Sequence, residues 1–160
     1  MEIFDPCMGW LANADREWEI KIMLLTIEKV IILKSVSIFA ETPEPILAEM
    51  ASILEEIEVK AGETVIRQGD IGTSMYIIID GHVRVYTKDR EIAQLGEREV
   101  FGEMAALDPE PRSATVAALE DTRLFRLEQE ALYDLMAEHI EVARGIIRVL
   151  CRRIRKMVSS

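Results

Sequence analysis

The middle of the chain, from Glu55 to Glu128, is divided into short β-forming runs by turn residues. β-Branched residues fill the runs, and glycine-containing steps separate them. Asp80-Gly81 is the clearest step, because Asp-Gly between β-branched runs is the strongest short-range signal for a hairpin. We therefore predict a hairpin of residues 75–79 and 82–86. The other predicted strands are residues 57–59, 65–66, 92–95, 100–101, 114–118 and 123–127.

Helical patterns precede this region. From Asp15, which is a good N-cap residue, apolar side chains recur at helical spacing as far as Ile38. Two prolines, Pro43 and Pro45, then mark a boundary, and a shorter helix is predicted over residues 44–53.

The helical pattern returns after the β-forming region. One apolar stripe begins after Glu128, and a second runs along a long last helix, residues 138–156. Short strands at this spacing are typical of a barrel or jelly roll. The predicted fold class is α+β and mainly β: a double-stranded β-helix, or jelly-roll barrel, with N-terminal helices and a long C-terminal helix. We assign residues 1–38 to a helical lead-in and residues 39–160 to the barrel domain.

Composition limits the class of protein. Hydrophobic residues make up 49% of the 160 residues and charged residues 30%, as in ordinary globular domains. The longest apolar candidate, residues 20–38, is interrupted by charges, so we expect no membrane span. The N-terminus has no basic region typical of a secretory signal, and the two cysteines, Cys7 and Cys151, have neither disulfide-framework nor metal-ligand spacing. These features predict a cytoplasmic protein.

Charge is spread unevenly along the chain. Residues 142–160 hold six cations and no acidic side chain, so the net charge of −10 leaves −16 on residues 1–141. A body this acidic repels nucleic acid, whose non-specific binding depends on Lys and Arg, and we expect no nucleic-acid partner. We favour the explanation that cations in the basic tail complement the dipole of a helix C-terminus, and the alternative is a tail that contacts a membrane or RNA.

Residues 101–116 carry the clearest chemistry. Gly102 allows positive φ or close approach of a ligand, and the helix-forming run 103–107 would present free N–H groups, which bind anions. Arg112, on a loop stiffened by two prolines, offers a fork that matches phosphate oxygens. Glu103 supplies an acceptor, which suits a sugar hydroxyl. Together these groups fit a compact ribose phosphate.

Each of these residues also has an ordinary structural explanation. Arg112 alone is more often a surface ion pair, here with Asp108 or Glu110, and Glu103 could simply complement a helix N-terminus. The two histidines and two cysteines lie far apart, so we expect no metal site. No Ser/His/Asp or Cys/His arrangement indicates catalysis, and Glu103 as a general acid or base would need a second titratable group that this segment does not offer.

The segment from Phe101 to Val116 resembles the phosphate-binding cassette of the cyclic-nucleotide-binding domain family. The family pattern reads Phe-Gly-Glu, a small-apolar triplet, and then Pro-Arg-x-Ala-Thr/Ser-Val. Upstream, residues 62–70, 75–78 and 81–85 resemble the glycine-punctuated barrel of the same family. The resemblance covers about residues 39–160.

The resemblance implies a role for each cassette residue. Glu103 would accept a hydrogen bond from the ribose 2′-hydroxyl, Arg112 would pair with the cyclic phosphate, and Ser113 would contact phosphate or purine. Backbone N–H groups of residues 102–105 and 114 would face the phosphate. The apolar wall near sugar and base would be Val83, Val85, Ile92, Leu95 and Val100. The implied ligand-binding set is Phe101, Gly102, Glu103, Met104, Ala105, Arg112, Ser113, Ala114 and Val85.

The resemblance also implies a function. It predicts a non-enzymatic sensor that binds a cyclic nucleotide, more often cAMP than cGMP in bacteria, and needs no cofactor. The last helix would close over the base as a lid, with a hinge at residues 137–139 and a soft point at Gly145. The helix 15–38 resembles the lead-in of longer bacterial proteins, so we expect a larger effector, fused or docked. The alternative is a nucleotide-free module whose helices pair two copies.

Overall fold

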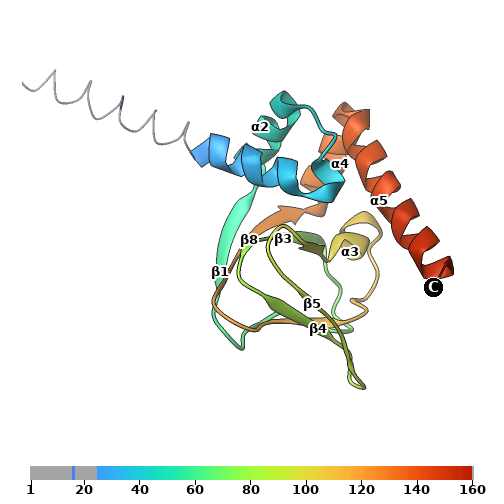
Figure 1. Ribbon diagram of the computed structural model, residues 1–160. Coiled ribbons are helices and arrows are strands. Elements are labelled where there is room, and N and C mark those ends of the chain that lie inside the picture. Colours follow the sequence, from blue (N-terminus) through green and yellow to red (C-terminus); the bar gives the residue numbers. More distant parts are fainter. Residues whose placement is uncertain (1–15, 17–24, 160) are drawn as a thin grey trace, which may run out of the picture.

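Two four-stranded antiparallel sheets form the body of the molecule (Figure 1). The computed structural model describes residue 16 and residues 25–159. One sheet has the order β1-β8-β3-β6 and the other β2-β7-β4-β5, which confirms the predicted jelly roll. The strands are β1 (Glu55–Val59), β2 (Thr64–Ile66), β3 (Ser74–Asp80), β4 (Val83–Tyr86), β5 (Glu91–Leu95), β6 (Val100–Phe101), β7 (Thr115–Ala118) and β8 (Thr122–Glu128).

The helices gather at one end of this barrel, except for the short α3, which lies between the barrel and α5 (Figure 1). Residues 25–35 are helical and lead into η1. No helix among the described residues has the length and apolar character that crossing a membrane requires. The elements are η1 (Ser37–Phe39), α2 (Glu44–Ile53), α3 (Glu103–Leu107), α4 (Gln129–Glu138) and α5 (Ile140–Val158).

Strand β3 is shared by two hydrophobic cores. Ile77 and Ile79 belong to the core that the helices cover, whereas Tyr76 and Ile78 belong to the core inside the barrel. Successive side chains of a strand point to opposite faces, and both faces of β3 are covered. This explains why the run 75–79 is continuously apolar rather than alternating.

The lead-in helix ends earlier than the sequence pattern predicts. Its helical residues stop at 35, Val36 is extended (φ −82°, ψ 129°), and η1 follows. The break lets Val36, Ile38 and Phe39 all reach the helical core, which one continuous helical face could not achieve. The predicted N-cap, Asp15, lies outside the described residues.

The predicted hairpin at Asp80-Gly81 is wrong. Strand β3 pairs with β6 and β8, whereas β4 pairs with β5 and β7, so the Asp80-Gly81 step carries the chain from one sheet to the other. Gly81 has a positive φ of 101°, and a Cβ there would lie 2.8 Å from the Thr122 Cα. Glycine is therefore required by a close backbone approach at a corner.

The junction between α4 and α5 lies within the predicted hinge. His139 is extended (φ −133°, ψ 98°) and separates the two helices. Gly145, predicted as a soft point, instead lies within an unbroken α5, where a Cβ would be 2.5 Å from the Ile38 carbonyl oxygen. Its small size lets α5 pack closely against η1.

We expect Gly81→Ala to lower the free energy of unfolding by about 3 kcal/mol, because it combines a left-handed backbone with overlap onto Thr122. Urea unfolding followed by circular dichroism measures this loss. Gly62→Ala is the control: its φ is 86° but no atom lies within 4 Å of the new methyl group, so it should cost about 1 kcal/mol. Equal losses in the two variants would contradict the packing requirement at Gly81.

Candidate functional site

An open cavity of about 590 Å³ lies between α3, the loop that follows it and the β2-β7-β4-β5 sheet. All nine residues of the predicted ligand-binding set line this cavity. Four further residues that we named as apolar wall or loop also line it: Ile92, Leu95, Val100 and Pro111. Val83, predicted as part of this wall, is instead fully buried in the barrel core.

Gly102 turns the chain from β6 into α3. It is the N-cap of α3 and has a left-handed φ of 78°. A Cβ at this position would lie 2.9 Å from Arg112 Nη1 and 3.0 Å from the Ser74 carbonyl oxygen. The positive φ expected of Gly102 is present, and the groups that approach it closely belong to Arg112 and Ser74. The first α3 hydrogen bond runs from the Ala106 N–H to the Gly102 carbonyl oxygen, so the N–H groups of residues 103–105 precede the helical ladder.

Arg112 is 8% exposed, and its guanidinium is bound by backbone carbonyls. Nη1 donates to the Gly102 oxygen at 3.0 Å, and Nη2 donates to the Ser74 oxygen at 2.7 Å. The ion pair with Asp108 or Glu110 considered above is absent among the described residues. Burial lowers the pKa of Arg112 from its usual value, although nearby Tyr76 and Glu128 oppose this effect.

The loop before β3 positions Arg112. The Arg112 N–H donates to the Asp70 oxygen, and the Gly69 N–H donates to the Arg112 oxygen, both at 2.8 Å. The guanidinium passes directly over Gly72, where a Cβ would lie 2.0 Å from Arg112 Nε. The sequence pattern marked Gly72 only as a turn residue. Its closeness to an arginine forty positions away has no local signal in the sequence.

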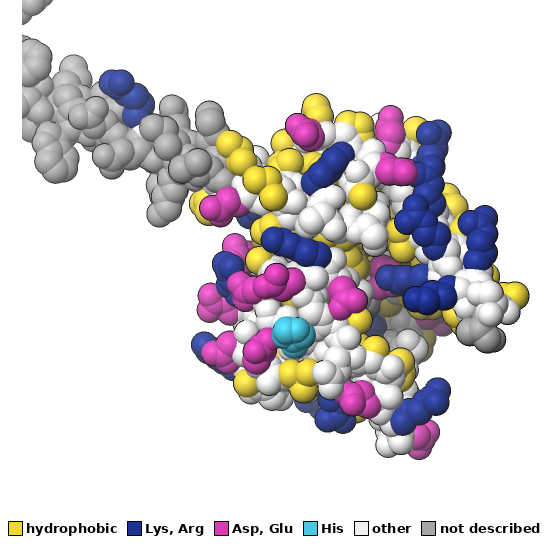
Figure 2. Space-filling model, viewed as in Figure 1, with side chains coloured by type: hydrophobic (Ala, Val, Ile, Leu, Met, Phe, Trp, Pro, Cys, Tyr) yellow, Lys and Arg dark blue, Asp and Glu magenta, His cyan; other side chains and the backbone are white. Residues whose placement is uncertain are grey.

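Glu103 is turned toward α5. Its side chain is 12% exposed, and its Oε1 accepts a hydrogen bond in an ion pair with Arg153 of α5. Arg153 also lines the cavity. We explained the basic residues of this tail by the helix dipole, so the sequence interpretation missed this contact. Arginine side chains gather along α5, on the side of the molecule seen at the right of Figure 2.

A polar network supports the Ser74 end of the site. The Ser74 hydroxyl donates to Glu128 Oε1 at 2.8 Å, and Arg126 Nε donates to the same oxygen at 2.7 Å. Burial opposes ionisation of Glu128, but hydrogen bonds from Ser74, Arg126 and Thr73 outweigh it and hold the pKa of this carboxyl below its usual range. The network therefore fixes the strand whose carbonyl binds Arg112.

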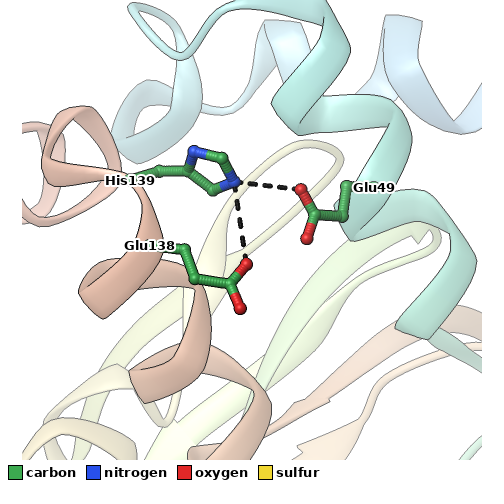
Figure 3. Close-up of side chains that lie close together, drawn as sticks. All are labelled: Glu49, Glu138 and His139. Carbon is green, nitrogen blue, oxygen red and sulfur yellow. Dashed lines mark hydrogen bonds and ion pairs between the residues drawn. The ribbon is translucent and has the colours of Figure 1, made fainter.

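A second cluster of titratable side chains lies at the α4–α5 junction (Figure 3). His139 Nε2 lies 2.9 Å from Glu49 Oε2 and 4.0 Å from Glu138 Oε2. Both carboxylates are solvent-exposed, and the contacts tie α2 to the residue between the two last helices. A hydrogen bond between His139 and Glu49 that fastens this junction accounts for the cluster.

We expect Gly72→Ala to displace the Arg112 guanidinium while leaving the fold intact. The new methyl group would overlap the flexible end of one side chain, so the free energy of unfolding should change by less than ~1 kcal/mol. The Arg112 Nε–H resonance in an NMR spectrum should shift. Gly96→Ala, whose methyl group would meet only the His82 ring at 3.1 Å, is the control. An unshifted Nε–H resonance in Gly72→Ala would contradict the placement of Arg112.

Known proteins are similar to this chain over a region that includes the cavity residues 85–114. A family model described as "Cyclic nucleotide-binding domain" matches residues 56–139. A "CRP-like cAMP-activated global transcriptional regulator" of Mycobacterium tuberculosis is 28% identical over 130 residues, which cover 78% of this chain and 58% of that protein. A "cGMP-dependent protein kinase" of Plasmodium berghei is 51% identical over 63 residues, 39% of this chain and 7% of the kinase.

A solved structure shares the fold. The catabolite activator protein of Thermus thermophilus superposes with a TM-score of 0.70 at 31% identity, over 76% of this chain and 59% of that one. The chain spans about half the length of the curated relatives it matches.

Proposed function

The chain belongs to the cyclic nucleotide-binding domain family, and we propose that it is a cAMP sensor that passes the binding signal through α5. The observation that carries this proposal is a buried, preassembled arginine at the cavity. A guanidinium that is 8% exposed and held only by two carbonyl oxygens keeps its full positive charge without a carboxylate partner. A bound anion would supply the missing charge.

The cavity suits a ribose cyclic phosphate in shape and in polarity. Arg112, the N–H groups of residues 103–105 and the Ser113 hydroxyl provide donors at one end. Glu103 provides an acceptor for the ribose 2′-hydroxyl. The other end, toward the purine, is apolar and is formed by Val85, Ile92, Ala93 and Leu95. A volume of about 590 Å³ is in the range of small-molecule sites.

Adenine is favoured over guanine as the base. A relative that matches 78% of this chain is described as cAMP-activated, whereas the cGMP-dependent kinase matches 39% of it. The wall on which the purine would lie is aliphatic, and it offers no polar side chain that would read the guanine edge. Of the described residues that line the cavity, Ser113 is the one that carries a hydroxyl, and we assign it to the phosphate.

The ion pair between Glu103 and Arg153 supports a route for the signal. It joins the proposed ribose acceptor directly to the helix that would act as the lid. A ligand that changes this contact changes the free energy of packing α5 against the barrel, and so shifts the population of its positions. Since the chain spans about half of its relatives, we propose that a larger effector, fused or docked, receives the signal.

Isothermal titration with cAMP and cGMP tests the sensor. We expect micromolar or tighter binding of cAMP and weaker binding of cGMP. Arg112→Ala should weaken cAMP binding at least about 30-fold, because removing one partner of a buried charge contact typically costs 2–5 kcal/mol. Glu103→Ala should weaken it about tenfold. Arg67→Ala, which removes an exposed arginine outside the cavity, is the matched control. Unchanged affinity in Arg112→Ala would contradict the site.

A second function, pairing of two copies, is favoured by one face of α5. Ile140, Ile147 and Ile154 recur every seven residues and are 60–63% exposed, as in the seam of a coiled coil. We expect a dimer in sedimentation velocity and a monomer for Ile147→Glu. Leu119→Glu changes an exposed leucine away from α5 and should leave the dimer intact. A wild-type monomer would contradict this pairing.

A further inference from the structure

We propose that Arg153 is a positioning residue that holds Glu103 and transfers to Glu97 when the ribose takes Glu103. This inference rests on the proposed function and adds a defined exchange of ion pairs to it. It assigns a role to the one arginine of α5 that contacts the cavity.

Arg153 lies where three hollows of the molecule meet. It lines the open cavity, a small apolar void of about 10 Å³ beneath α5, and a third hollow of about 310 Å³ on the other side. Its side chain is 48% exposed, so it is free to change rotamer, whereas Glu103 is 12% exposed and fixed by α3. Of the two partners, the arginine is the one that can move.

The ribose and Arg153 require the same carboxylate. Glu103 is the acidic side chain nearest the N-terminus of α3, and one of its oxygens already accepts a hydrogen bond from Arg153. A ribose hydroxyl that reaches Glu103 must displace or share this charge-assisted bond. Arg153 is therefore an internal competitor of the ribose for Glu103, and ligand affinity contains the free energy of releasing it.

The third hollow offers Arg153 another partner. Its charged lining is Glu97, Arg98 and Glu99 of the turn between β5 and β6, together with Arg153 itself. Glu99 is engaged, because its Oε2 accepts the Gly96 N–H at 2.6 Å. Glu97 is exposed and has no ion-pair partner among the residues that the structure describes. Arg98 between them adopts a positive φ of 69°.

The rest of α5 can stay in place during this exchange. Arg148 of the same helix pairs with Glu41, and Val142, Ile146 and Val149 are buried in the helical core. Only the C-terminal turns of α5 beyond these contacts depend on the position of Arg153. The exchange thus gives two discrete positions of the Arg153 side chain, which a bound nucleotide would select.

A double-mutant cycle measured by isothermal titration with cAMP tests the exchange. Arg153→Ala should bind cAMP about three- to tenfold more tightly than the wild type, because the contact it loses in the empty state, to a buried carboxylate, is stronger than the exposed contact it loses in the bound state. Glu97→Gln should bind about twofold to threefold more weakly. In the Arg153→Ala background, Glu97→Gln should have no effect.

Arg152→Ala is the matched control, because it removes an exposed positive charge from the neighbouring position of α5. It should leave the affinity within twofold of wild type. Unchanged or weaker binding by Arg153→Ala overturns the inference, and so does a Glu97→Gln effect that persists without Arg153. If neither the wild type nor Arg153→Ala binds cAMP or cGMP, the proposed function itself fails, which is a different result.

Discussion

The placement of the Arg112 guanidinium is the interaction on which the rest of the site depends. It bridges the Ser74 carbonyl of β3 and the Gly102 carbonyl at the start of α3, and it does so by crossing Gly72. Two segments far apart in the chain, residues 72–74 and 102–112, therefore meet at one charged group. A buried cation bound only by neutral oxygens is costly without a negative partner, which supports the proposal that an anion binds here.

Strand β3 connects this site to the helices. Its first residue, Ser74, binds Arg112 through its carbonyl and Glu128 through its hydroxyl. Its later residues alternate between the barrel core and the helical core. A displacement of β3 at the cavity would therefore disturb the packing of both cores. Close-packed interiors resist continuous deformation, which favours a response by side-chain exchange at the edge of the site rather than by distortion of the barrel.

Most of the fold could be predicted from the sequence, because the elements differ in periodicity. The helix 44–53 and the barrel strands follow from local patterns, and so does the one-turn helix after Gly102. The errors concern contacts between distant residues. Asp80-Gly81 has the local chemistry of a hairpin, but the chain crosses there from one sheet to the other. Glycine is required at this crossing because the Thr122 backbone lies close to it. Gly145 has the local chemistry of a flexible point, but the sequence does not show that a Cβ there would overlap the Ile38 carbonyl oxygen.

The site shows the same division between local and distant information. The nine cassette and wall residues could be named because they lie within short motifs, and the structure brings all of them to one cavity. Gly72 and Arg153 could not be named, since each acts on a cassette residue from a distant element. A basic helix end is compatible with the dipole explanation whatever its side chains touch, so composition alone cannot separate a solvated arginine from one that faces a buried carboxylate. The packing of α5 against α3 makes that distinction, because it brings Arg153 into contact with the Glu103 carboxylate at the edge of the cavity.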